Sequence, residues 1–194
     1  DAFASHAAVG TIVLVGDTQT QALIAPTPVL RRAAAGTSRR TSVASGLAAL
    51  ADLADDAIVL VHDSARPGVD GDVIDRLLDT MTQGAIAATP ALAVADTLMT
   101  VDSGTAGNIV DRSRMVRVQT PQAFRLGTLR RAHRQWTGEE PTDDAQMVRA
   151  IGGGVAVVAG SVRLHKLTWA DDVLLLEALL GAKDQEMESY RTAV

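Results

Sequence analysis

The stretch "VLVHDSARPGVDGDVIDRLL" (Val59 to Leu78) joins a strand-like apolar run to a helix-like segment through a charged turn. The run at 58–61 contains only Ile, Val and Leu, and His62 and Asp63 follow it directly. A strand inside a sheet gains by remaining apolar, and a charged group is costly to bury unless it is paired or hydrogen-bonded. The sequence therefore indicates that a charge is needed where this strand ends.

Strand-like and helix-like segments alternate along the rest of the chain. The predicted strands lie at 11–15, 57–61, 85–88 and 155–158. The predicted helices lie at 43–54, 73–81, 126–136, 143–151 and 170–180. The βαβαβ order of the first half, with crossovers of this length, favours parallel strands in a sheet covered by helices on both faces.

The region that follows Pro90 has a looser pattern. Short runs rich in Val, Thr and Leu flank the turn-forming segment "DSGTAGN" at 102–108. This apolar region has no evident core to join. We interpret residues 91–118 as a protruding arm or hairpin.

Composition limits the class of protein. The chain has 194 residues, of which 47% are hydrophobic and 21% charged, and this favours a single globular domain over 1–194. The absence of cysteine excludes disulfides, thiolate metal sites and a cysteine nucleophile, and it fits a reducing compartment. A net charge of −5 gives no attraction to nucleic acid or acidic membranes.

The apolar runs and the first residues bear on where the protein resides and how it begins. No apolar run approaches the roughly 20 residues of a membrane span, so we expect no membrane insertion and a cytoplasmic location. The chain opens at Asp1 with what reads as the tail of a helix leading into a strand. We therefore expect that an N-terminal segment is missing.

Asp63 stands where ligands bind in open parallel sheets, outside the carboxyl end of a strand. A carboxylate there can hold a divalent cation and its phosphates, and Arg66 can pair with Asp63 or with a phosphate. The alternative is that Asp63 and Arg66 only cap a turn that Pro67 stiffens.

Other polar segments have a structural and a functional interpretation. "GTSRRTSVASGL" (36–47) places a glycine, hydroxyls and arginines before a helix, where the backbone N–H groups favour an anion; taken alone, an ordinary helix start with Thr41 or Ser42 as N-cap is the better reading. Arg112 and Lys166 are isolated cations beside hydroxyls. "PTDDAQMV" (141–148) needs no more than an N-cap with acidic residues in the first turn.

In combination and in order, these segments resemble the 2-C-methyl-D-erythritol 4-phosphate cytidylyltransferases of the non-mevalonate isoprenoid pathway. The resemblance extends from the first strand to about residue 180. The matching pieces are "GTSRRTSVASGL" (36–47), "VHDSARP" (61–67), "ADT" (95–97), "VDRS" (110–113), "QTPQAF" (119–124), "TDDA" (142–145) and "HKLTWADDVLLLEALL" (165–180).

The resemblance implies a Rossmann-like nucleotidyltransferase fold: α/β, with a mostly parallel sheet, helices on both faces and a protruding β-arm. It implies CTP and methylerythritol phosphate as substrates, Mg²⁺ as the metal, and a homodimer in which the 91–118 arm reaches into the neighbouring site. The CTP-binding residues that it implies are Gly36, Arg39, Ser42, Asp63, Ser64 and Arg66, with Asp63 also near the metal. The residues that it implies for the sugar phosphate are Asp63, Thr97, Arg112, Thr120, Thr142 and Lys166.

Arg112 and Lys166 match the catalytic residues that position the phosphate nucleophile, and Thr97 and Arg112 would act in the partner subunit's site. The sequence departs from the family in lacking its opening glycine-rich loop, which carries an arginine and precedes a lysine. A protein without that loop is expected to have low or no activity. Milder departures are Thr37 for an acidic residue, Ser64 for alanine, and Met99 near the place of a lysine.

Three hypotheses remain open at this point. The first is the methylerythritol phosphate cytidylyltransferase. The second is a relative that acts on another polyol phosphate, such as ribitol 5-phosphate. The third is a non-catalytic dimeric paralogue that binds nucleotide or nothing.

Overall fold

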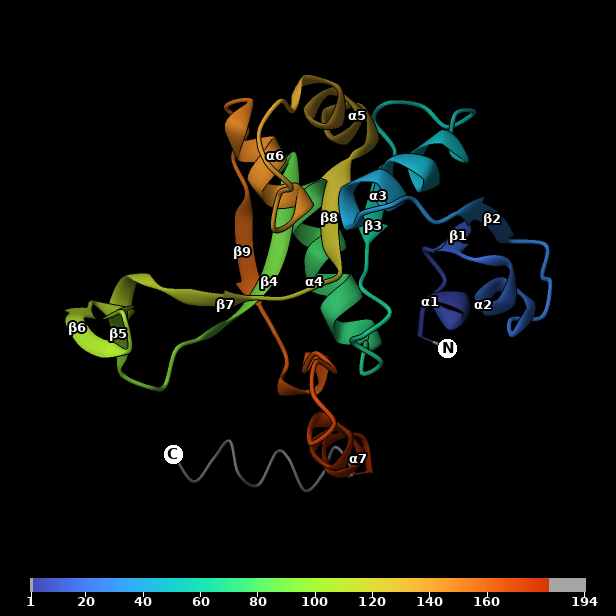
Figure 1. Cartoon of the computed structure of the whole chain (residues 1–194). Coiled ribbons are helices and arrows are strands. Elements are labelled where there is room, and N and C mark those ends of the chain that lie inside the picture. Colours follow the sequence, from blue (N-terminus) through green and yellow to red (C-terminus); the bar gives the residue numbers. More distant parts are fainter. Residues whose placement is uncertain (1, 182–194) are drawn as a thin grey trace.

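The computed structural model describes residues 2–181, which form an α/β arrangement of helices around sheets (Figure 1). The strands are β1 (Ile12–Gly16), β2 (Leu30–Ala34), β3 (Ile58–Val61), β4 (Ala87–Ala93), β5 (Leu98–Asp102), β6 (Thr105–Val110), β7 (Val116–Val118), β8 (Gln122–Arg125) and β9 (Ala156–Ala159). The helices are α1 (Ala2–Ser5), α2 (Thr18–Ala22), α3 (Arg39–Ala48), α4 (Gly71–Thr82), α5 (Leu126–Gln135), α6 (Asp144–Ala150) and α7 (Asp172–Gly181). Two short 3₁₀ turns, η1 (Arg112–Arg114) and η2 (Val162–Leu164), complete the list.

The main sheet contains β3, β8, β4, β7 and β9. β8 pairs antiparallel with both β3 and β4, so β3 and β4 run in the same direction, and β9 is parallel to β4. β7 is antiparallel to β4. The expected mostly parallel sheet is thus found only in part, because the antiparallel strand β8 lies between β3 and β4, and the first strand of the predicted order, β1, lies outside this sheet.

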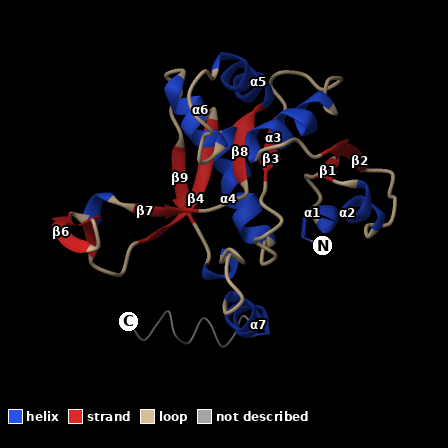
Figure 2. Ribbon diagram, in the orientation of Figure 1, coloured by secondary structure: helices blue, strands red, loops and turns tan. Residues whose placement is uncertain are grey.

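The two faces of this sheet are covered by different helices. Ala87 and Phe124 are register partners, and they pack into one core cluster with residues of α3, α5 and α6. The next pair, Ala88 and Ala123, belongs to a second cluster with α4. Successive strand side chains point to opposite faces, so helices cover both faces of the sheet, as expected (Figure 2).

β1 and β2 form a separate parallel two-stranded sheet. Helix α3 packs against it: Val13 of β1 belongs to the same core cluster as Leu47 of α3. Gly46 permits a close approach, since a Cβ there would lie 3.0 Å from Cγ2 of Val15. The N-terminus of α3 lies near the carboxyl end of β3, since Arg39, its first residue, bonds to Asp63.

The protruding arm expected within 91–118 is present. β5 and β6 form a hairpin well away from the main sheet, at the left of Figure 1. Ser103 and Gly104, at its tip, both have positive φ (48° and 82°), as a tight two-residue hairpin turn requires. Ile109 is 75% exposed, so the rest of the chain does not cover this apolar side chain of the arm.

Within residues 2–181 we find no helix with both the length and the apolar character that crossing a membrane requires.

Candidate active site

Asp63 lies in a tight turn directly after β3. The backbone N–H of Asp63 donates to Oγ1 of Thr120 over 3.1 Å, and the N–H of Arg66 donates to the carbonyl of Asp63 over 3.0 Å. Thr120 precedes β8, the neighbour of β3 in the sheet. These bonds fix the start of the turn against the adjacent strand and leave the carboxylate free to make other contacts.

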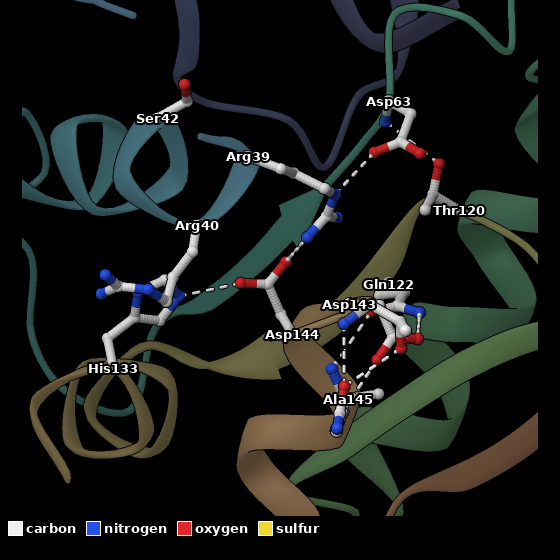
Figure 3. Close-up of polar contacts among 12 residues, drawn as sticks. Arg39, Arg40, Ser42, Asp63, Thr120, Gln122, His133, Asp143, Asp144 and Ala145 are labelled. Carbon is white, nitrogen blue, oxygen red and sulfur yellow. Dashed lines mark hydrogen bonds and ion pairs between the residues drawn. The ribbon is translucent and has the colours of Figure 1, made fainter. Parts of the chain in front are cut away.

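Two cations flank that carboxylate (Figure 3 shows Arg39). Nε of Arg39 donates to Oδ1 over 3.1 Å, and Nζ of Lys166 donates to Oδ2 over 3.1 Å. The Asp63 side chain is only 17% exposed. Burial alone would raise its pKa, but the charge of Arg39 and the hydrogen bond from Lys166 outweigh burial and lower the pKa of Asp63. The carboxylate is therefore ionised at neutral pH.

Arg39 is the first residue of α3, and the cap of this helix orients it. Ser38 is the N-cap: its side chain accepts from the N–H of Thr41, and the Thr41 side chain accepts from the N–H of Ser38. The expectation that Thr41 or Ser42 is the N-cap is therefore wrong, because the helix begins earlier and Thr41 completes the capping box. Ser42 instead accepts from the N–H of Gly36 over 3.0 Å. Gly36 is required by this loop, since a Cβ on it would collide with the side chain and backbone of Thr41.

The Arg66 side chain binds a backbone carbonyl rather than the Asp63 carboxylate. Its Nη1 donates to the carbonyl of Leu164 over 2.6 Å, and burial lowers the pKa of the guanidinium. The sequence indicated either the Asp63 carboxylate or a phosphate as the partner of Arg66. The Asp63 carboxylate is not its partner, although the Asp63–Arg66 turn itself is present.

His62 stabilises the same turn through both of its ring nitrogens. Its Nε2 lies 3.0 Å from the Arg66 carbonyl and its Nδ1 lies 3.1 Å from Oγ1 of Thr120. A carbonyl only accepts, so Nε2 carries the proton and Nδ1 can accept from the hydroxyl of Thr120. Burial lowers the pKa of His62, which favours this neutral ring.

A pocket of about 260 Å³ opens beside Asp63. Its lining residues are Arg39, Asp63, Arg66, Val118, Gln119, Thr120, Gln122, Thr142, Asp143 and Lys166. Three cations and two carboxylates contribute to it, together with hydroxyl and amide groups. Such a lining suits an anionic ligand that carries hydrogen-bonding groups.

The pocket brings together six of the residues singled out from the sequence, namely Arg39, Asp63, Arg66, Thr120, Thr142 and Lys166. Gly36 and Ser42 lie beside it at the start of α3. Ser64 is exposed and does not line the pocket. Thr97 and Arg112 are exposed on the arm and do not line the pocket of their own chain.

Sequence reasoning missed the residues that support the pocket at the start of α6. The motif predicted an N-cap without naming the residue; Asp143 is that N-cap, and its Oδ2 also accepts from Nε2 of Gln122 over 2.8 Å. Asp144 is fully buried and binds Arg39 and His133 (Figure 3). The "TDDA" motif was the only signal for these contacts, and it gave no indication of the partners.

A metal ion at this site would depend on few protein ligands. In the part of the chain that the structure describes, no group of three or more His, Cys, Asp or Glu side chains is placed to hold one. Mg²⁺ fits such a site, because it is commonly held by one or two carboxylates together with substrate phosphates and water. Asp63 supplies an ionised carboxylate of the required kind.

Comparison with known proteins places the chain in one family. The family model "2-C-methyl-D-erythritol 4-phosphate cytidylyltransferase" (IspD) matches residues 1–182. The bifunctional enzyme IspD/IspF of Sphingopyxis alaskensis is 52% identical over 195 residues, which cover 100% of this chain and 48% of that protein. The chain thus spans about half the length of this relative. The 2-C-methyl-D-erythritol 4-phosphate cytidylyltransferase of Roseobacter denitrificans is 39% identical over 186 residues, covering 94% of this chain and 82% of that protein.

Solved structures agree with the sequence comparison. A crystal structure of 4-diphosphocytidyl-2C-methyl-D-erythritol synthase superposes with a TM-score of 0.83 at 33% identity, covering 92% of this chain and 85% of that one. The 2-C-methyl-D-erythritol 4-phosphate cytidylyltransferase from Thermus thermophilus superposes with a TM-score of 0.76 at 35% identity, covering 90% and 84%. The α/β fold is the one these enzymes share, and the chain belongs to the 2-C-methyl-D-erythritol 4-phosphate cytidylyltransferase family.

Proposed function

We propose that this protein transfers a cytidylyl group from CTP to 2-C-methyl-D-erythritol 4-phosphate, giving CDP-methylerythritol and pyrophosphate. The observation that carries the proposal is the ionised Asp63 between Arg39 and Lys166, at a strand end that opens into a polar pocket. The names of the relatives support the same reaction and favour it over ribitol 5-phosphate as acceptor and over a non-catalytic role.

The reaction needs positioning and charge neutralisation more than covalent chemistry. A phosphate oxygen of the sugar phosphate attacks the α-phosphorus of CTP, the bond from that phosphorus to the bridging oxygen of the β-phosphate breaks, and pyrophosphate leaves. Both reactants are anions, so cations that hold them in line lower the barrier. Arg39, Arg66 and Lys166 are the pocket residues that supply this charge.

The roles proposed for the residues that line the pocket or lie near it follow their positions. Gly36, Arg39 and Ser42 at the start of α3 bind CTP, together with Asp63, Ser64 and Arg66 in the turn after β3. Thr120, Thr142 and Lys166 contact the sugar phosphate, and Lys166 orients its attacking oxygen. Asp63 would hold Mg²⁺, and the ion would supply positive charge that neutralises the phosphates.

The arm is proposed to act in a homodimer. Thr97 and Arg112 lie outside the pocket of their own chain, and the arm carries exposed apolar side chains such as Ile109. A neighbouring subunit that covers the arm would explain both observations, with Arg112 acting on the acceptor phosphate in the neighbour's site. The cytoplasm is the proposed compartment, in keeping with the absence of cysteine.

The proposed reaction is tested by incubating the full-length protein with CTP, methylerythritol phosphate and Mg²⁺ and separating the products by chromatography. CDP-methylerythritol and pyrophosphate should appear in equal amounts. Ribitol 5-phosphate, offered as the only acceptor in a parallel reaction, should be a much poorer substrate. A preference for ribitol 5-phosphate would reassign the acceptor, and binding of CTP without turnover by either acceptor would support the non-catalytic alternative.

A further inference from the structure

Asp144 is a fully buried carboxylate at the start of α6, and both of its oxygens are occupied (Figure 3). Oδ2 accepts from Nη1 of Arg39 over 2.6 Å, and Oδ1 lies 2.8 Å from Nε2 of His133. The His133 side chain is 7% exposed. The three side chains come from α3, α5 and α6, which pack on the same face of the main sheet.

Stability alone explains this network poorly. A buried ion pair is expensive to desolvate, and replacing a whole buried pair with apolar side chains is often neutral or stabilising. Among residues 2–181, Nη2 of Arg39 and Nδ1 of His133 are buried with no hydrogen-bond partner, which adds a further cost. What the network does provide is a single orientation for the guanidinium of Arg39.

That orientation is defined at two points. Nη1 of Arg39 is held by Asp144, so Nε is left to donate to Oδ1 of Asp63. A guanidinium has a rigid planar fork of donors, so fixing one nitrogen on a buried carboxylate fixes the direction of the others. Without Asp144, the same side chain would be free to turn both terminal nitrogens onto Asp63 or into solvent.

His133 has the corresponding role for Asp144. A carboxylate only accepts, so Nε2 of His133 carries the proton shared with Oδ1. This bond removes the freedom of Asp144 to rotate and leaves Oδ2 directed at Arg39. His133 therefore acts on the pocket through two intermediaries and lines none of it.

We propose that Asp144 and His133 are positioning residues, a buried carboxylate–imidazole pair that sets the orientation of Arg39 and thereby the ability of the pocket to bind CTP. The effect on CTP binding rests on the proposed function, whereas the orientation of Arg39 does not. The test therefore has one readout on Arg39 itself and one on CTP.

Two substitutions of His133 distinguish the loss of its hydrogen bond to Asp144 from the loss of the imidazole ring itself. The amide nitrogen of His133→Gln lies near the place of Nε2 and can still donate to Asp144, whereas that of His133→Asn lies near the place of Nδ1 and cannot reach. Asp144→Asn removes the charge at constant shape. Arg130→Leu is the matched control, because Arg130 is on the same helix, pairs with Asp55 and lies outside the pocket.

The first readout is the ¹H–¹⁵N signal of Arg39 Nε, identified by its loss in Arg39→Ala. It should be protected from solvent exchange in the wild type, in His133→Gln and in Arg130→Leu, and it should broaden or disappear in His133→Asn and Asp144→Asn. Equal protection in all four variants would overturn the positioning role, whether or not the protein binds CTP.

The second readout is the CTP dissociation constant from calorimetry, with the KM values for both substrates. A lost charge-assisted contact predicts about a tenfold weakening for CTP in His133→Asn, with the sugar phosphate KM changed less than about twofold. Adding His133→Asn to Arg39→Ala should cause no further loss of CTP affinity, because both act through one guanidinium. Additive losses would overturn the proposal, and so would a loss in His133→Gln as large as in His133→Asn.

Discussion

Nζ of Lys166 lies 3.1 Å from Oδ2 of Asp63, although 103 positions separate the two residues in the chain. Arg39 occupies the other oxygen of the same carboxylate, so Asp63 links the start of α3 to the segment before α7. The carboxylate organises two of the three pocket cations. Removing the charge of Asp63 is therefore the most direct test of the site.

Asp63→Asn should abolish magnesium-dependent cytidylyl transfer and leave the fold intact. The substitution removes the charge with little change of shape, the Asp63 backbone bond to Thr120 does not involve the side chain, and Arg39 keeps its partner Asp144. Product formation and circular dichroism measure the two effects. Asp52→Asn, which affects an ion pair with Arg31 outside the pocket, should keep its activity. Transfer at the wild-type rate by Asp63→Asn would remove Asp63 from the mechanism.

The strands and helices with a clear apolar period were predictable from the sequence. The helix expected at 73–81 is α4 (Gly71–Thr82), and the strand expected at 57–61 is β3 (Ile58–Val61). Strand β8 was missed because "QTPQAF" carries a proline, which locally indicates a turn, and its apolar run is too short to indicate a strand. Gln122 is fully buried in β8 because its amide pairs with Asp143 and with the N–H of Ala145. Those partners come from a later segment of the chain, so local sequence cannot indicate the strand.

The same limit applies to the site. The charge at the end of β3 was visible, because an aspartate directly after an apolar strand contradicts the local pattern. The partners of Arg39 were not visible, because Asp144 is 105 residues away and its motif is fully explained by helix capping. A motif with a sufficient local explanation can therefore conceal a second role that depends on tertiary contacts.

The arm should hold a dimer together. Met99 and Ile109 are cross-strand partners in the β5–β6 hairpin, so they share one face, and they are 48% and 75% exposed. Replacing both with lysine should convert a dimer to a monomer in sedimentation velocity at micromolar concentration, because it places charge in an apolar contact. Val157→Lys, at an exposed valine of β9, should leave the dimer unchanged. A wild-type protein that sediments as a monomer would refute the dimer.

Asp172 should contribute stability that is lost in acid. Hydrogen bonds from His165 and from the N–H groups of Trp169 and Thr168 lower the pKa of Asp172 to about 2 from its ordinary value of 3.8. Because the folded protein releases this proton more readily than the unfolded chain, the contribution is complete above pH 3.8 and is lost as the pH falls toward about 2.

Asp172→Asn should therefore lower the urea midpoint near neutral pH, and the gap to the wild type should narrow below pH 3.8. Asp171→Asn, at the neighbouring residue, is the control for a general change of charge. A gap that stays constant down to the lowest pH at which the wild type still folds would contradict the shifted pKa.

Arg112 should act on the acceptor phosphate of the partner subunit's site. It is exposed on the arm, outside the pocket of its own chain, and a charge-assisted contact to phosphate predicts a loss of about tenfold or more when it is removed. Arg112→Ala should raise the KM for the sugar phosphate and lower kcat, with little change in CTP affinity. Coexpression of Arg112→Ala with the inactive Asp63→Asn chain should restore part of the activity, because one hybrid site then carries both intact residues. Unchanged sugar phosphate kinetics would exclude Arg112 from the site, and heterodimers without recovered activity would exclude an arm that crosses between subunits.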